Sequence, residues 1–190
     1  MDIRTSAGYY SSFLGAALLL VGLVFVTFPL NYFVYSLNDF GDIQADSENK
    51  RKGNFLFGAK EDEPTLQRAV WFSTAIIILF GMLFYWIAGW WMIPLFSSII
   101  IVNFIYNFEP FLIKTRPPLE LLTQTGYILT GVFSVVLNEL EMLPWQTVVY
   151  LTFFCFQAHL AGEIMDIDLD QAANKGPLQC SLADFGARCL

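Results

Sequence analysis

Long apolar segments alternate with short polar ones along the whole chain. Five segments are almost free of charged residues, and each is about as long as the twenty or so residues that an α-helix needs to cross a bilayer. They cover residues 11–37, 69–89, 92–113, 119–137 and 145–164. We therefore expect an all-α, polytopic membrane helix bundle of about five transmembrane helices, forming a single membrane-embedded domain over residues 1–190.

The polar connections and the prolines predict where these helices bend and begin. Pro29 lies inside the first apolar segment, where a missing backbone N–H bends a helix. Residues 47–67 are hydrophilic and rich in charge, which is typical of a long surface loop. Pro64 and Thr65 at its end predict the start of the second helix, because proline is favoured in the first helical turn.

The composition supports a membrane protein and excludes other classes. Of the 190 residues, 56% are hydrophobic and 14% are charged, with a net charge of −7, whereas soluble domains carry about 25% charged residues. Lys and Arg are few and do not interleave with aromatic residues along a soluble face, so nucleic acid is not an expected partner. The three cysteines match neither a disulfide framework nor a zinc spacing.

The basic residues predict the orientation in the bilayer. With five crossings, the loops after the first and third helices and the segment after the fifth lie on one side. That side carries nine of the ten basic residues: Lys50, Arg51, Lys52, Lys60, Arg68, Lys114, Arg116, Lys175 and Arg188. Because positive residues in short loops mark the cytoplasmic face, we expect an integral protein of the cell or inner membrane with this side in the cytoplasm.

An acidic stripe follows the first apolar segment on this side. Asp39, Asp42 and Asp46 would lie within about 60° of one another on a continuous helix. Like charges this close repel unless cations lie between them. Mg²⁺ takes oxygen ligands and is usually held by one or two carboxylates together with substrate phosphates. The stripe therefore predicts half of a magnesium–diphosphate site, and the alternative is an acidic helix end in contact with solvent.

A second acidic stripe ends the fifth apolar segment on the same side. Glu163, Asp166 and Asp170 share one helical face, whereas Asp168 points away from it. His159 lies one turn earlier on that face, and it is either a ligand or acid–base group or a hydrogen-bonded pocket residue. Lys114 and Arg116 come between the two stripes in the sequence, and such cations suit a ligand with two phosphates. Aromatic rings around such a ligand can stabilise a carbocation that forms when diphosphate leaves.

These segments together resemble the motifs of one family. Residues 38–46 fit the NDxxDxxxD motif of UbiA-type intramembrane prenyltransferases, residues 106–116 resemble their Tyr-Pro-Lys loop, and residues 166–170 resemble their second acidic motif. The three motifs occur in the family's order over essentially the whole chain. The resemblance implies a helical fold with a central cavity, a polyprenyl diphosphate donor, Mg²⁺ dependence and a hydrophobic, often aromatic acceptor within the membrane. The activity implied is that of a transferase of alkyl groups other than methyl.

The resemblance also implies roles for single residues. Asn38, Asp39, Asp42, Asp46, Asp166 and Asp170 would bind magnesium and diphosphate, Lys114 and Arg116 would contact the phosphates, and Tyr106 would line the site. We count Glu163 and His159 among the expected substrate-binding residues. An acceptor pocket can also draw on other polar and aromatic residues of the same helices: Tyr32, Tyr35, Asn103, Asn107 and Gln124.

The length of the chain opens alternatives to stand-alone catalysis. Family members have about nine helices, so the resemblance implies that this chain lacks the first helix and the last three. It would then be either a truncated, catalytically silent member or scaffold, or an enzyme whose bundle another chain completes. A cation-coupled transporter is a further alternative, which would need acidic residues near the bilayer midplane.

Overall fold

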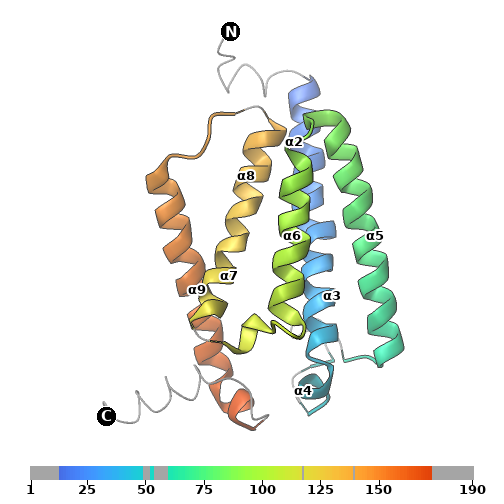
Figure 1. The fold of residues 1–190 in the computed structure, drawn as a ribbon, viewed down its shortest axis with the longest axis vertical. Helices are drawn as coiled ribbons and strands as arrows, with labels where there is room; N and C mark the ends of the chain where they lie inside the picture. The colour runs from blue at the N-terminus through green and yellow to red at the C-terminus, as the bar shows by residue number, and fades with distance from the viewer. Residues whose placement is uncertain (1–12, 49–51, 54–59, 117, 139, 173–190) are drawn as a thin grey trace.

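The structure is a computed structural model that describes residues 13–48, 52–53, 60–116, 118–138 and 140–172, and Figure 1 shows its helices. In chain order these are α2 (Phe13–Phe25), a π-helical turn η1 (Val26–Leu30), α3 (Asn31–Gly41), α4 (Ile43–Glu48), α5 (Glu63–Ala88), α6 (Met92–Asn107), a 3₁₀ turn η2 (Ile113–Thr115), α7 (Leu119–Gln124), a 3₁₀ turn η3 (Thr125–Tyr127), α8 (Ile128–Leu137) and α9 (Trp145–Ala172). These described residues contain no strand, which confirms the predicted all-helical class.

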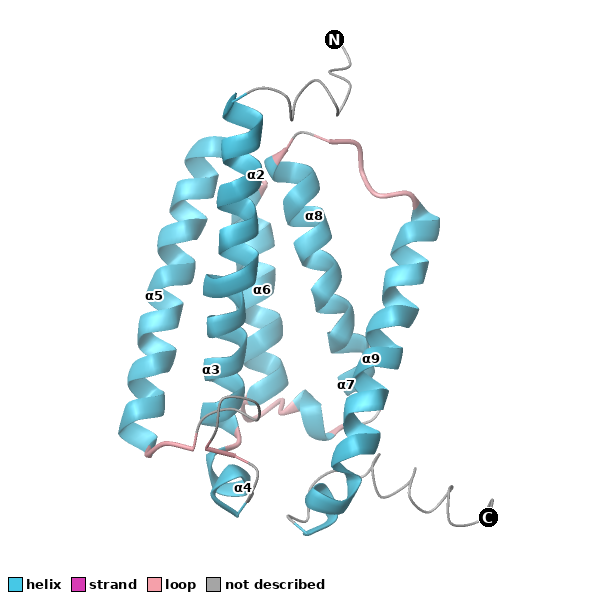
Figure 2. Ribbon diagram, turned by 180° about the vertical axis from the view of Figure 1, so that it is seen from behind, coloured by secondary structure: helices cyan, strands magenta, loops and turns pink. Residues whose placement is uncertain are grey.

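In the part of the chain that the structure describes, the helices form five rods that run alternately in opposite directions. The first rod joins α2, η1 and α3, and the fourth joins α7, η3 and α8, while α5, α6 and α9 are single helices. α4, η2 and the end of α9 all lie at one end of the bundle, the lower end in Figures 1 and 2. We call this end the polar end. The sequence predicted that the segments after the first, third and fifth helices lie on one side. The common location of α4, η2 and the end of α9 confirms this expectation.

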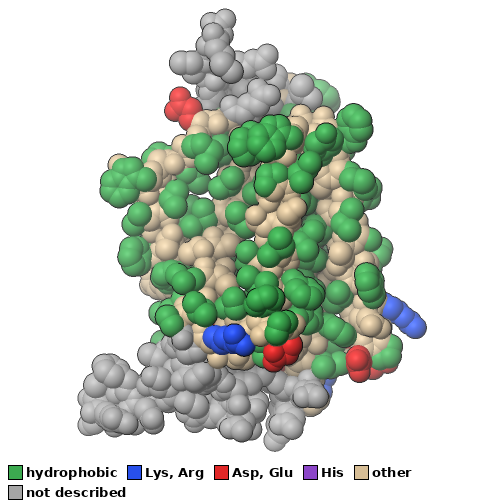
Figure 3. Space-filling model, in the orientation of Figure 1, with side chains coloured by type: hydrophobic (Ala, Val, Ile, Leu, Met, Phe, Trp, Pro, Cys, Tyr) green, Lys and Arg blue, Asp and Glu red, His purple; other side chains and the backbone are tan. Residues whose placement is uncertain are grey.

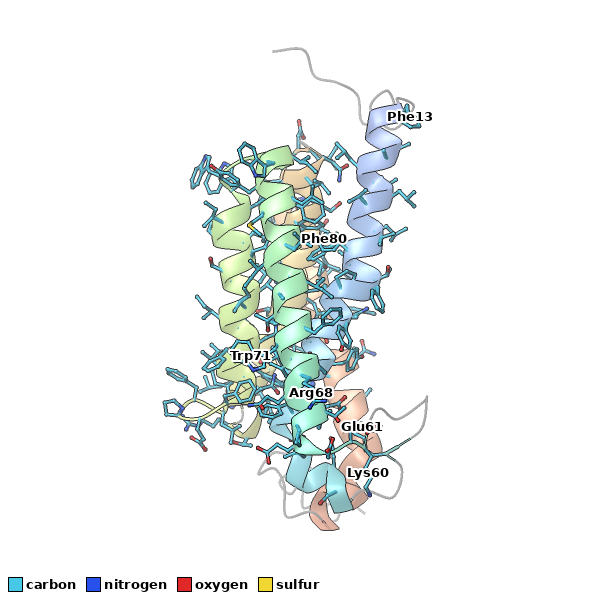
Figure 4. The ribbon with its side chains drawn as sticks, turned by 90° about the vertical axis from the view of Figure 1, so that its right-hand side faces the viewer. Phe13, Lys60, Glu61, Arg68, Trp71 and Phe80 are labelled. Atoms are coloured by element: carbon cyan, nitrogen blue, oxygen red, sulfur yellow. The ribbon has the colours of Figure 1, made fainter. Side chains whose placement is uncertain are left out.

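Three of the rods are long and apolar enough to cross a membrane: Gly15–Gly41, Glu63–Ala88 and Leu119–Leu137. α6 is a shorter apolar helix, and α9, which carries His159 and the second acidic stripe, is not among the three within the described residues. Apolar side chains cover most of the face drawn in Figure 3, and its basic side chains gather toward the polar end. Figure 4 places Lys60, Glu61 and Arg68 near that end and Phe13 at the other. The protein is a membrane helix bundle.

Pro29 gives the first rod its irregular turn. Proline has no N–H to donate to the carbonyl four residues earlier, and residues 26–30 form a π-helical turn around it. Two side chains beside the turn donate to carbonyls of the same rod: the Thr27 hydroxyl to that of Leu23 at 2.8 Å and the Asn31 amide to that of Thr27 at 3.1 Å. The turn therefore presents polar side chains in the middle of an apolar rod.

Phenylalanine rings fill the centre of the bundle. Phe25 of α2 contacts rings from α5, α6 and α8, with centroids 5.2–5.3 Å from those of Phe84, Phe96 and Phe133. The buried core cluster draws on the first four rods, and none of its described buried residues belongs to α9. Since α9 packs mainly on α7 and η3, space remains between it and the rest of the bundle.

A polar contact fixes α3 against α5. The hydroxyls of Ser36 and Ser73 lie 2.7 Å apart and both are buried. Small residues allow helices in a membrane to approach closely, and hydrogen bonds between them add about 0.6 kcal/mol each. This contact helps to set the rotation of α3, and with it the direction of the acidic residues that follow.

Candidate functional site

A cavity of about 690 Å³ lies between α3, α6, the fourth rod and α9. Its size is typical of small-molecule sites. Along the first rod it extends from Val26 to Asp42, roughly 24 Å at the rise of an α-helix. Five of its lining residues are exposed at the surface: Thr27, Asn31, Tyr35, Tyr127 and Ala158. Tyr35 is 63% exposed and Tyr127 is 56% exposed. The cavity therefore has a polar end at Asp42 and an opening at the outer surface of the bundle.

The first acidic stripe is not the continuous helix that the sequence analysis assumed. α3 ends at Gly41, and Asp42 leaves the helical region with φ −106° and ψ 9° before α4 begins at Ile43. The backbone still bonds on both sides of this break, from the Asp42 N–H to Asn38 at 3.0 Å and from the Asp46 N–H to Asp42 at 2.8 Å. At this break, Asp42 pairs with a different lysine from the one that Asp39 and Asp46 share.

Asp39 and Asp46 share one lysine. The Lys52 ammonium lies 2.6 Å from Asp39 Oδ1 and 3.1 Å from Asp46 Oδ2, and all three side chains are about 15% exposed. Burial by itself would lower the pKa of Lys52, but the hydrogen bonds and negative charges of the two carboxylates outweigh it and raise that pKa. A single positive charge thus lies between two aspartates of the predicted metal-binding motif.

Asp42 pairs with the lysine of the loop that follows α6. The Lys114 ammonium lies 3.0 Å from Asp42 Oδ1 and donates to Asn107 Oδ1 at 3.3 Å. A Cβ atom on Gly41 would stand 3.1 Å from this ammonium and 3.2 Å from the Asn107 carbonyl oxygen, so a larger residue would make the neighbours move by a few tenths of an ångström. Asp42, Lys114 and Asn107 all line the cavity, which gives its polar end both signs of charge.

The loop between α6 and α7 turns sharply to place Lys114 there. Leu112 has a positive φ of 42°, and the 3₁₀ turn η2 follows it directly. Arg116, one residue after η2, is exposed, and its guanidinium donates to the Pro110 carbonyl at 3.0 Å. It does not line the cavity, so the contact of Arg116 with a phosphate stays a prediction.

The second acidic stripe lies on the last turns of α9. The helix continues to Ala172, so Glu163, Asp166 and Asp170 are on helical backbone at the polar end (Figure 2), while their side chains lie outside the described residues. His159 precedes them on α9 and lines the cavity together with Gly162. Whether the two stripes face each other across the cavity stays a prediction.

Within the described side chains, no three His, Cys, Asp or Glu residues come close enough to hold a metal ion by themselves. The carboxylates still fit Mg²⁺, because each aspartate of the first stripe already binds a positive charge. An ammonium nitrogen lies 2.6–3.1 Å from a carboxylate oxygen of each one, where a metal ion would also be attracted. A magnesium site built from one or two carboxylates together with substrate phosphates needs no third protein ligand. Asp39, Asp42 and Asp46 are thus the described residues that could hold such an ion.

Most of the residues expected in the pocket line the cavity, but Tyr32 does not. Those that do are Tyr35, Asn38, Asp42, Asn103, Tyr106, Asn107, Lys114, Gln124 and His159. The sequence analysis missed Lys52 and Tyr127. Lys52 stands among other cations in a hydrophilic loop, and no local pattern distinguishes it from Lys50 or Arg51. Its role depends on the path of that loop.

Replacing Lys52 with glutamine should strengthen metal binding several-fold. The neutral side chain would no longer compete with a cation for Asp39 and Asp46, and it would leave their negative charges in place. Mn²⁺ titration of the full chain in nanodiscs, followed by electron paramagnetic resonance, measures this affinity. Lys60→Gln is the matched control, because Lys60 is exposed and belongs to the same connection. Equal or weaker Mn²⁺ affinity in Lys52→Gln would contradict this account of the ion pair.

Comparison with known proteins adds an independent observation. The sequence model described as the UbiA prenyltransferase family matches residues 5–187. A lycopene elongase/hydratase of Corynebacterium glutamicum is 25% identical over 171 residues, which cover 88% of this chain and 59% of that protein. A lycopene elongase/hydratase of Haloarcula japonica is 25% identical over 155 residues, covering 79% and 50%. The chain thus spans about half to three-fifths of the length of these relatives, and no solved structure matches it.

Proposed function

Because this chain belongs to the UbiA prenyltransferase family, we propose that it takes part in the transfer of a prenyl group from a polyprenyl diphosphate to a hydrophobic acceptor within the membrane. One observation carries the proposal. The Asp42–Lys114 pair, with Asn107, stands at one end of a cavity, and beyond Asn38 its first-rod wall carries no charge: Tyr35, Val34, Asn31, Leu30, Thr27 and Val26. A molecule with a charged head and a long uncharged tail matches this arrangement.

The donor would lie along the first rod with its diphosphate at the polar end. Lys114 would move from Asp42 to the diphosphate, where its ammonium neutralises charge that grows on the leaving group. Asn38 and Asn107 offer amide hydrogens at the same end. Tyr106, which lines the cavity, would present its ring to positive charge on the first prenyl carbon.

Bound Mg²⁺ would supply additional positive charge to the diphosphate, and the chain's own carboxylates would hold it. We propose Asp39, Asp42 and Asp46 from the first stripe and Asp166 and Asp170 from the second, with Glu163 and Arg116 near the phosphates and His159 in the cavity wall. Further helices, of the same or another chain, that covered the opening at Tyr35 and Tyr127 would keep water away from the reacting carbon. We also propose that the polar end faces the cytoplasm, because the described basic residues of the connections lie there.

The direct test uses the full chain in nanodiscs with labelled donors of graded length, from five to twenty carbons, with Mg²⁺ or with EDTA. We expect binding that needs Mg²⁺, and turnover when a suitable acceptor is supplied from a panel of quinone precursors, tetrapyrroles, glycerol lipids and carotenoid hydrocarbons. Binding without turnover would identify a catalytically silent member of the family. If no donor bound in a Mg²⁺-dependent manner, prenyl transfer would have to be abandoned.

A further inference from the structure

The first rod lines the cavity with two parallel stripes of side chains, in each of which successive residues are four apart. The inner stripe consists of Val26, Leu30 and Val34, and the outer stripe consists of Thr27, Asn31 and Tyr35. Leu30 is only 7% exposed, whereas all three residues of the outer stripe are exposed. The inner stripe is therefore an apolar wall inside the cavity, and the outer stripe lies at its opening.

The opening is polar but carries no charge. Four of the five exposed lining residues have a hydroxyl or an amide: Thr27, Asn31, Tyr35 and Tyr127. The fifth is Ala158 of α9, whose small side chain leaves room there. A charged ligand would find no counter-ion among these five residues.

Asn31 and Tyr127 lie at the same depth on two different rods. The rings of Phe25, Phe96 and Phe133 contact one another, with centroids 5.2–6.2 Å apart, and so mark one level in three rods. Asn31 follows Phe25 by six residues and Tyr127 precedes Phe133 by six, which places each about 9 Å from this level toward the polar end. One ligand at the opening could therefore contact both side chains.

This level lies deep in the bilayer. The first rod crosses as Gly15–Gly41, and Asn31 is at least ten residues, about 15 Å, from either end of that span. Lipid headgroups stay at the membrane surface, and lipid tails offer no hydrogen bonds. Polar side chains are costly at such depth and mark functional sites. The outer stripe therefore fits an occupant that forms hydrogen bonds, rather than a lipid tail or a hydrocarbon.

The hydrogen bonds within the outer stripe indicate which group the occupant needs. The Thr27 hydroxyl donates to the Leu23 carbonyl at 2.8 Å, so its oxygen can only accept from a ligand. The Asn31 amide donates one hydrogen to the Thr27 carbonyl at 3.1 Å and keeps its own carbonyl oxygen and one N–H. A ligand hydroxyl can donate to these oxygens and accept from that N–H. A carboxylate has no hydrogen to donate.

We propose that the outer stripe and Tyr127 form the acceptor subsite, and that they bind the hydroxyl of an uncharged, unsaturated alcohol or phenol. This inference rests on the proposed prenyl transfer, with the tail of the donor along the inner stripe. Tyr106, which would face the first prenyl carbon, follows Phe96 by ten residues and lies about 6 Å nearer to the polar end than Asn31. The bound hydroxyl is thus away from the reacting carbon and orients the acceptor.

A carbon of the acceptor, and not its hydroxyl oxygen, is then the nucleophile. The carbon–oxygen bond of the donor breaks, and its electron pair leaves with diphosphate. A double bond of the acceptor supplies the electron pair of the new carbon–carbon bond. The proton that the acceptor loses passes to the departing diphosphate.

The test uses the full chain in phosphatidylcholine nanodiscs and an uncharged, unsaturated alcohol carrying a diazirine and an alkyne. We expect light-induced cross-links on the peptides that contain Asn31 or Tyr127. Excess 2-naphthol or citronellol should reduce them at least about fivefold, and the methyl ethers of both compounds less than about twofold, because an ether has no hydrogen to donate. Competition by 2-naphthol alone would identify a phenol, and competition by citronellol alone an aliphatic alcohol.

Asn31→Leu removes the amide and should reduce the cross-links by a similar factor. Tyr127→Phe removes only a hydroxyl, and it remains informative if Asn31→Leu fails to fold. Gln157→Leu is the matched control, because Gln157 is an exposed amide on α9 that does not line the cavity. Its cross-links should equal those of the unaltered chain.

Equal competition by the hydroxyl compounds and their ethers, or unchanged cross-links in both Asn31→Leu and Tyr127→Phe, would show contact with bulk lipid only and overturn the inference. Mg²⁺-dependent donor binding is measured in the same samples. Retained donor binding without hydroxyl-dependent competition overturns the acceptor subsite alone. Hydroxyl-dependent competition without donor binding supports a site for a hydroxyl compound and contradicts prenyl transfer.

Discussion

Asp42→Asn is expected to weaken Mg²⁺-dependent binding of a polyprenyl diphosphate by at least about 100-fold, which corresponds to about 2.7 kcal/mol. The amide keeps the shape of the carboxylate but removes the negative charge that a magnesium ion requires. Asp42 is the aspartate of the first stripe that lines the cavity and pairs with Lys114 at 3.0 Å. Calorimetric titration of the full chain with a thiodiphosphate analogue of the donor, with and without Mg²⁺, measures the loss.

Glu61→Gln is the control for this substitution. Glu61 is an exposed acidic residue on the connection before α5, near the polar end (Figure 4), so its loss changes the net charge without touching the cavity. Donor binding by this variant should remain within about twofold of the unaltered chain, because exposed charges are well screened by water and salt. Equal affinities for Asp42→Asn and Glu61→Gln would refute the assignment of Asp42 to the magnesium–diphosphate site.

Phe84→Ala should lower the free energy of unfolding by about 3–5 kcal/mol, as is typical when a buried phenylalanine is truncated to alanine. Phe84 is fully buried, and its ring centroid lies 4.9 Å from that of Phe133 and 5.3 Å from that of Phe25. Removing a buried ring leaves a void whose walls lose their contacts. Because lipid gives little hydrophobic drive between helices, packing carries most of the stability there. Steric-trap or thermal unfolding in detergent measures the change.

Phe72→Ala makes the same chemical change on the same helix at a position that is 62% exposed. Its cost should stay below about 1 kcal/mol, because lipid or detergent replaces most of the lost contacts and exposed positions are usually tolerant. If the two variants lost equal stability, the ring cluster around Phe25 would not be the centre of the fold.

The apolar pattern predicted the helices well where tertiary contacts add little. The predicted segment 119–137 has the bounds of the structural span Leu119–Leu137. Pro64 predicted the start of α5 to within a residue, since the helix begins at Glu63. Asp62 caps it there by accepting a hydrogen bond from the Thr65 N–H. The predicted helix 92–113 ends earlier, at Asn107, since the chain must turn through a positive φ at Leu112 to bring Lys114 back to Asp42.

The sequence by itself determined the helical class and the shared end of the connections after the first, third and fifth apolar segments, because these depend on local pattern and on the number of crossings. The tertiary structure alone decided the break at Asp42, the lysine partner of each aspartate and the turn at Leu112. Each of these is set by contacts between residues far apart in the chain, such as Lys52 with Asp39, and local periodicity carries no information about which distant side chains meet.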